Sequence, residues 1–160
     1  MSYSISTLLT RNLHDVFGEN DPARRRAAID EIFTEDCVFY DPSRNVYRGR
    51  DEIDRVAGAI RATHPDFRYQ PIAGPEELGN VGRVQWVSGR PGEAPAYAGT
   101  DFIIARDGGI AAVYLFSTSY PELDSAVRRP MRRIGDDGTT IAKPRSSSMC
   151  LSQNGRTSCR

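Results

Sequence analysis

Apolar residues recur at helical spacing in the first part of the chain. Over residues 5–17 they are Ile5, Leu8, Leu9, Leu13, Val16 and Phe17. This period predicts an amphipathic helix that ends at Gly18. Asp21-Pro22 is typical of an N-cap followed by the first helical residue, and it predicts a second helix through about Phe33.

A short apolar run, Val38-Phe39-Tyr40, follows and stops at Asp41-Pro42. Pro42 favours an extended conformation of Asp41, so a carboxylate stands where a strand ends and the chain turns. Taken alone, this stretch favours simple turn initiation by Asp41. A third helix is predicted from Gly49 to the residue before His64-Pro65. Its apolar stripe consists of Ile53, Val56, Ala57 and Ile60.

From residue 67 onward the period changes to the alternation that is typical of strands. The predicted strands cover residues 67–72, 81–87, 97–105 and 110–119. Pro71 favours an edge position for the first, and Asp107-Gly108-Gly109 predicts a hairpin turn between the last two. This order predicts an α+β fold, in which three N-terminal helices pack on one face of a curved, mainly antiparallel sheet.

The apolar pattern fades after about Pro121. We therefore expect one domain over residues 1–125 and a C-terminal extension over residues 126–160. Because residues 131–160 hold few apolar side chains to bury, their composition favours a mobile tail.

Composition narrows the classes of function. The 160 residues are 39% hydrophobic and 26% charged, with 21 basic and 21 acidic side chains. This charge balance argues against nucleic acid or an anionic membrane as a partner, and no apolar run approaches the roughly 20 residues that span a bilayer. The N-terminus lacks the basic segment of a secretory signal, and three unpatterned cysteines fit a reducing cytoplasm. Two histidines argue against a histidine-rich metal site.

A carboxyl group interrupts one otherwise apolar strand at Asp101. Strand residues two apart share a face, so Asp101 shares one with Tyr97 and Ile103. If that face is inward, burial raises the pKa of Asp101. The alternative is a solvent-facing Asp101, paired with Arg83 or Arg106. By the same alternation Trp86 shares a face with Val84 and Ser88. In the last strand, another set of residues shares a face of the sheet. That set is Ala112, Tyr114, Phe116 and Thr118.

Three local sequence patterns follow one another along the chain. They are Asp21-Pro22, the stretch V-F-Y-D-P…Y-R-G-R-D-E-I, and G-T-D-F-I-I-A-R-D-G-G-I. Together they resemble the nuclear transport factor 2-like superfamily, and within it the SnoaL-like (polyketide cyclase) and ketosteroid isomerase branches, over residues 5–119. The resemblance implies a cone, in which a strongly bent sheet wraps round the helices and leaves a cavity at its wide end. It also implies chemistry without a cofactor, and a homodimer through the outer face of the sheet. The residues we expect on that face include Ile104, Val113 and Leu115.

The resemblance also implies site residues. Ketosteroid isomerases place a general-base Asp after the first strand, where Asp41 matches, and a protonated Asp on a later strand, where Asp101 matches. They also use a Tyr of the first helix as a donor to the oxyanion. Leu13 stands at that position, which argues against steroid isomerisation by the same route.

Two classes of function follow. In the first, Asp41 removes a proton next to a carbonyl group and a neutral Asp101 donates to the enolate oxygen, which is isomerase, cyclase or dehydratase chemistry. In the second, the cavity binds a small apolar molecule without turnover, or the sheet docks a partner. In the first class, Asp41 and Asp101 point into one cavity, and in both classes we expect four aromatic residues to line it. They are Trp86, Tyr97, Tyr114 and Phe116.

Overall fold

The computed structural model describes residues 3–119, so the predicted extension over residues 126–160 lies outside the described residues. The helices are α1 (Ile5–Arg11), the π-helical η1 (Asn12–Val16), α2 (Pro22–Ile32) and α3 (Gly49–Thr63). The strands are β1 (Phe33–Tyr40), β2 (Val46–Arg48), β3 (Arg68–Pro71), β4 (Glu76–Leu78), β5 (Val81–Gly89), β6 (Tyr97–Arg106) and β7 (Gly109–Ser119). The predicted α+β class and the order of helices and strands are confirmed.

Local chemistry explains where the first helices begin. The Asp21 carboxylate accepts hydrogen bonds from the backbone N–H groups of Ala23 and Arg24, both at 2.9 Å. These contacts and Pro22 at the first position confirm the predicted start of α2. Ser4 caps α1 in the same way through the N–H of Thr7.

The seven strands form one sheet. Six follow in the order β2-β1-β7-β6-β5-β3, and β4 pairs with the first residues of β5. All strand pairs are antiparallel except β1 with β7, which is parallel. The edge position of β3 confirms the prediction from Pro71. The sequence did not indicate β2 or β4, nor that β1 begins at Phe33 directly after α2.

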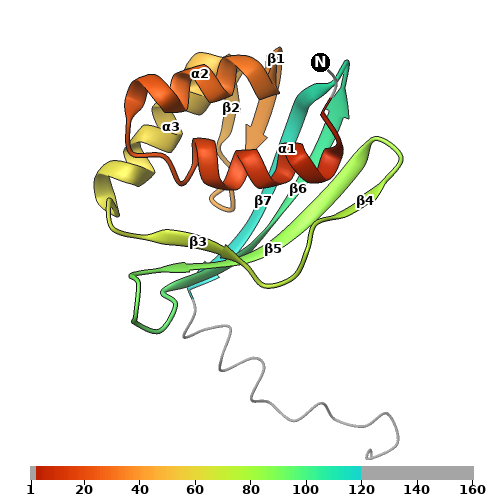
Figure 1. Cartoon of the computed structure of the whole chain (residues 1–160). Helices are drawn as coiled ribbons and strands as arrows, with labels where there is room; N and C mark the ends of the chain where they lie inside the picture. Colours follow the sequence, from red (N-terminus) through yellow and green to blue (C-terminus); the bar gives the residue numbers. More distant parts are fainter. Residues whose placement is uncertain (1–2, 120–160) are drawn as a thin grey trace, which may run out of the picture. The chain divides into compact units, whose positions relative to one another are not determined.

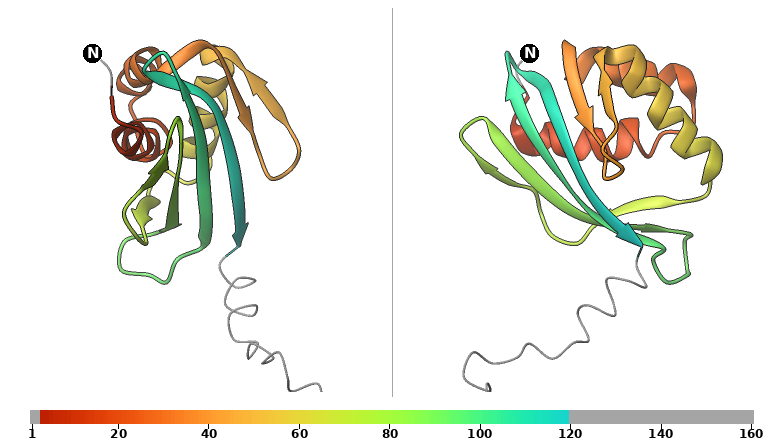
Figure 2. Two further views of the ribbon diagram at one scale, coloured as in Figure 1. Left: turned by 90° about the vertical axis from the view of Figure 1, so that its right-hand side faces the viewer. Right: turned by 180° about the vertical axis from the view of Figure 1, so that it is seen from behind.

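The helices gather on one face of the curved sheet, as Figure 1 and both views of Figure 2 show. The core lies between them and the sheet. Its largest fully buried side chains include Leu8, Leu9, Leu13, Ile29, Ile32, Phe33, Phe39 and Ile53. No helix within residues 3–119 is long and apolar enough to cross a membrane.

A bulge in β7 reverses the predicted faces of its second half. Ile104 pairs with Ala112 whereas Ala105 pairs with Ile110, so Ala111 is an extra residue on β7. Ile110 and Val113 are therefore both buried, although a regular strand would place them on opposite faces. The prediction that Val113 and Leu115 face outward is wrong, because Val113 is in the core and Leu115 lines an inner pocket.

Candidate functional site

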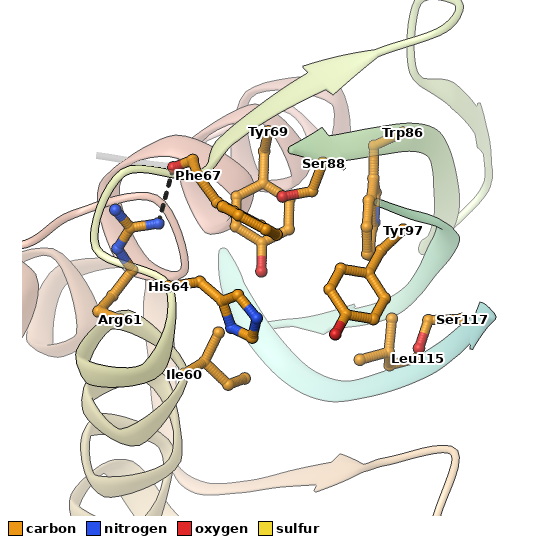
Figure 3. A pocket seen from close by; sticks show the side chains of 10 residues that line it. All are labelled: Ile60, Arg61, His64, Phe67, Tyr69, Trp86, Ser88, Tyr97, Leu115 and Ser117. Carbon is orange, nitrogen blue, oxygen red and sulfur yellow. Dashed lines mark hydrogen bonds between the residues drawn. The ribbon is translucent and has the colours of Figure 1, made fainter. Parts of the chain in front are cut away.

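A pocket of about 210 Å³ opens where the end of α3 faces the inner side of the sheet (Figure 3). It is lined mainly by aromatic and aliphatic groups, with hydroxyl groups, an imidazole and a guanidinium among them. The lining residues are Ile60, Arg61, His64, Phe67, Tyr69, Trp86, Ser88, Tyr97, Leu115 and Ser117. A mostly apolar cavity with a few convergent polar groups is the usual form of a small-molecule site.

His64 reaches the pocket because α3 ends there. It is the C-cap residue of α3, and its N–H bonds to the carbonyl oxygen of Ile60. Its ring centroid lies 4.4 Å from that of Phe67 and 5.6 Å from that of Tyr97. Figure 3 shows the imidazole pointing into the space between these rings and Leu115. The sequence predicts His64 as the residue that ends the helix, and the structure also places its imidazole in the pocket lining.

Tyr69 of β3 forms the opposite wall. Its ring meets the Trp86 ring edge to face at 4.9 Å, and Figure 3 shows its hydroxyl group pointing into the pocket. Burial, and then the negative charge of Asp101, raise the pKa of Tyr69 to about 12. The hydroxyl group therefore keeps its proton at neutral pH and is a hydrogen-bond donor.

Asp101 lies behind the Trp86 ring and is only 4% exposed. One carboxyl oxygen accepts from Trp86 Nε1 and the other from Asn12 Nδ2, both at 2.9 Å. Burial raises the pKa of Asp101 to about 6, against the opposing effect of these two hydrogen bonds. The inward orientation of Asp101 is thus confirmed. Arg83 and Arg106 instead pair with other carboxylates, those of Glu76 and Asp36.

Asn12 is a buried polar residue that the sequence analysis missed. It is fully buried in η1, and its Oδ1 atom has no hydrogen-bond partner among the described residues. The signal was available, because Asn12 follows Leu8 and Leu9 on the apolar stripe of the first helix at three and four residues' distance. A polar residue on such a stripe indicates a buried polar contact.

Asp41 lies at the end of β1, half-exposed. Its carboxylate accepts from the backbone N–H and the side-chain amide of Asn45, at 2.8 and 2.9 Å, and from the Tyr47 hydroxyl group at 3.2 Å. Partial burial opposes its ionisation, but these hydrogen bonds outweigh that effect and lower the pKa of Asp41. The carboxylate is charged at neutral pH, and the bonds to Asn45 close the turn.

The sheet register relates the two carboxylates. Tyr40, just before Asp41, pairs with Tyr114, and the next residue of β7, Leu115, pairs with Asp101. Asp41 and Asp101 are thus about two strand spacings apart along the sheet, roughly 10 Å between backbones. Leu115, between them, lines the pocket, whereas neither carboxylate belongs to its lining, so this pocket does not bring the two carboxylates together as predicted.

The four predicted aromatic residues divide between the two faces of the sheet. Trp86 and Tyr97 line the pocket. Because of the bulge, Tyr114 and Phe116 lie on the other face, where Tyr114 stacks on Tyr40 at 4.7 Å between centroids. Phe116 is 66% exposed and borders a separate shallow groove with Ile72 and Gln85. The prediction that all four line one cavity is therefore wrong for Tyr114 and Phe116.

The described residues offer no group of three or more His, Cys, Asp or Glu side chains arranged for a metal ion. What the pocket does offer is a flat aromatic enclosure, donors from Tyr69, Tyr97 and Ser88, and the imidazole of His64. Such groups suit a cyclic molecule with a carbonyl oxygen.

Comparison with known proteins adds a family. A model of the SnoaL-like domain matches residues 10–113. One similar structure, from Agrobacterium tumefaciens, is named as a proposed isomerase of the SnoaL-like family. Its sequence is 25% identical to this chain and its TM-score is 0.66, and the match covers 71% of this chain and 97% of that one. A second similar structure, from Sinorhizobium meliloti, is named as a proposed polyketide cyclase. Its sequence is 20% identical and its TM-score is 0.54, and the match covers 69% of this chain and 94% of that one. A search of curated proteins finds no significant match.

Proposed function

Because this chain belongs to the SnoaL-like family, we propose that it is a cofactor-independent enzyme that moves a proton next to the carbonyl group of a small cyclic, mostly apolar compound. This is chemistry of the isomerase or cyclase type, which the names of similar structures also suggest. The observation that carries the proposal is the convergence of His64 and the protonated hydroxyl group of Tyr69 on one aromatic pocket.

Tyr69 and His64 have complementary roles in this proposal. Tyr69 donates a hydrogen bond to the carbonyl oxygen, and the bond strengthens as negative charge develops there in the transition state. His64 accepts the proton from the neighbouring carbon and returns it at another position. Tyr69 thereby supplies from β3 the donor for which the first helix has only Leu13.

The two carboxyl groups take indirect roles. Both oxygens of Asp101 already accept hydrogen bonds, so Asp101 positions the Trp86 wall through Nε1. Asp41 is the alternative base, as the family resemblance implies. The hydrogen bonds from Asn45 and Tyr47 lower the pKa of Asp41, which makes it a weaker base than a carboxylate without them.

The hydrogen bonds that both carboxyl groups already accept favour a second candidate function, which is binding without turnover. In that case the pocket holds the same class of compound, but no carboxylate is free to act on it. The two candidates share the ligand and differ in whether a carbon–hydrogen bond breaks.

Proton exchange distinguishes them. In D₂O, the enzyme should accelerate exchange of the protons next to the carbonyl group of 2-tetralone, followed by proton NMR. His64→Gln and Tyr69→Phe should each slow this exchange by about 100-fold or more. The matched controls are His14→Gln, at the only other histidine and exposed, and Tyr40→Phe, which lies away from the pocket lining.

The outcomes separate the candidates. If Asp41→Asn abolishes exchange while His64→Gln does not, Asp41 is the base. If 2-tetralone quenches the fluorescence of Trp86 but no variant or wild-type protein exchanges its protons, the chain binds without turnover.

A further inference from the structure

Two arginines are buried among residues 3–119, and they differ in their partners. Arg25 is 6% exposed, and its guanidinium forms an ion pair with Asp54 at 2.7 Å. Arg61 is 4% exposed, and its guanidinium has no carboxylate of the described residues within 4.0 Å, so the charges of Glu19 and Asp66 act on it only from farther away. A buried cation without an opposite charge is costly, since desolvation is not offset by attraction.

Neutral oxygens hold Arg61 in place. Its Nε donates to the Asn20 side chain at 2.7 Å, and its terminal nitrogens donate to the carbonyl oxygens of Phe67 at 2.9 Å and Pro65 at 2.6 Å. These contacts brace the turn after α3, but they do not neutralise the charge. A guanidinium has five N–H groups, so two remain without a partner among these contacts.

Arg61 borders two spaces beside the end of α3. Arg61 lines the pocket described above and also a neighbouring, more polar hollow of about 350 Å³. Phe67 and Tyr69 are walls of both spaces. Figure 3 shows the guanidinium beside Phe67, at the end of the pocket where α3 finishes.

Asp101 lies outside the pocket lining, where it accepts a hydrogen bond from Trp86 Nε1. Its charge acts on Tyr69, and so does the charge of Arg61. A ligand in the pocket therefore meets the buried cation directly and is separated from the buried carboxyl group by the Trp86 ring. An anionic group is stabilised at Arg61 and disfavoured near Asp101.

We propose that the substrate carries a carboxylate, which the Arg61 guanidinium binds, on the same small ring compound whose carbonyl group faces Tyr69. This deepens the proposed function and rests on it. One buried positive charge matches one negative charge, and two remaining N–H groups match the two oxygens of a carboxylate. The carboxylate also fixes the direction of the ring, so that the carbonyl end lies toward Tyr69.

A matched pair of probes tests this. Benzoate and benzamide have the same planar shape and differ in charge. Binding is measured with the full chain through Trp86, which is the only tryptophan and lines the pocket. Wild-type protein should bind benzoate at least about 10-fold more tightly than benzamide, because that ratio corresponds to one hydrogen bond to a charged group.

Variants locate the source of the preference. Arg61→Gln should lose it and keep its affinity for benzamide within about threefold. The control Arg55→Gln, on the exposed side of α3 and paired with Glu52, should keep it. Should Arg61→Gln fail to fold, Arg61→Lys keeps a charge with a poorer fit and should show a reduced preference. In wild-type protein, the NMR signal of the Arg61 Nε–H should shift with benzoate and not with benzamide.

Each contrary result has its own meaning. Equal affinities of wild-type protein for the two probes would overturn the assignment of Arg61 and leave the proposed function intact. A preference that survives in Arg61→Gln, or an Nε–H signal that ignores benzoate, would overturn it as well. If neither probe changes Trp86 fluorescence at millimolar concentration, the pocket does not take ring compounds, and the proposed function falls together with this inference.

Discussion

The inner side of the sheet has two ends that treat buried charge in opposite ways. At the packed end, where α2 and α3 cover the sheet around Ile29 and Ile53, the buried Arg25 has the carboxylate of Asp54 as its partner. At the open end, around the pocket, Asp101 and Arg61 are buried among neutral partners alone. Both ends belong to one sheet and share α3, which contributes Asp54 to the first and Arg61 to the second.

This difference indicates what each end is for. Pairing at the packed end offsets the desolvation of the guanidinium and serves stability. Unpaired charges at the open end lower stability, and proteins retain such groups where they act on a ligand. The open end is accordingly the place where the chain keeps its reactive and recognition groups, and the packed end holds them in position.

The largest expected effect is at the packed end. Ile29 is fully buried, so Ile29→Ala should lower the free energy of unfolding by about 2–5 kcal/mol. Leu115→Ala should cost less, because Leu115 borders an existing pocket and its removal enlarges open space. Urea unfolding of both variants measures the two costs. Equal costs would remove the distinction between the ends.

The next effect is a pH dependence at Asp101. The pKa of this carboxyl group is about 6 in the folded chain, against 3.8 for its ordinary value. Below about pH 4 it is protonated in both the folded and the unfolded chain and has no effect. Between about pH 4 and 6 the folded chain holds the proton that the unfolded chain has lost, so stability falls as the pH rises. Above about pH 6 the full decrease in the free energy of unfolding is reached, at about 3 kcal/mol.

Asp101→Asn isolates this contribution. An amide does not titrate, and the unpartnered Oδ1 of Asn12 can accept from the new amide once the Asn12 side chain turns over. The difference in unfolding free energy between variant and wild type should therefore shift in favour of the variant by about 3 kcal/mol from pH 3 to pH 7. Urea unfolding at both pH values measures it. A constant difference would mean that Asp101 is not desolvated.

The smallest expected effect on the fold is on the outer face of the sheet. There Phe116 and Ile72 are 66% and 61% exposed. We propose a homodimer through this face, with Phe116 and Ile72 in place of Val113 and Leu115, which were expected there together with Ile104. Phe116→Asp should change the unfolding free energy of the subunit by less than about 0.5 kcal/mol and yield monomers. Sedimentation at tens of micromolar measures this. A wild-type monomer, or a variant that still dimerises, would contradict it.

Most of the fold followed from local patterns. The helical stripes, the Asp21-Pro22 start and the strand alternation before β7 all depend on neighbouring residues, and the structure confirms them. The parallel pairing of β1 with β7 was not predictable, because it joins segments about 75 residues apart with no local signal. The short strands β2 and β4 likewise depend on the neighbours that they pair with.

The site was only partly predictable. The burial of Asp101 followed from one acidic residue in an apolar strand. Tyr114 and Phe116 were assigned to the wrong face because a single extra residue, Ala111, reverses the alternation. His64 and Arg61 belong to the site only because α3 ends against the sheet, a packing relation that periodicity does not contain.

Contacts between a bound ring compound and the protein show which part of the sheet holds the ligand. With 2-tetralone in excess, nuclear Overhauser effects should connect its ring protons to the methyl groups of Ile60 and Leu115 and to the His64 ring, all at the open end. Contacts with Phe116 and Ile72 instead would place the ligand in the groove on the outer face. That result would contradict the account, because none of the unpaired buried charges would then face the ligand.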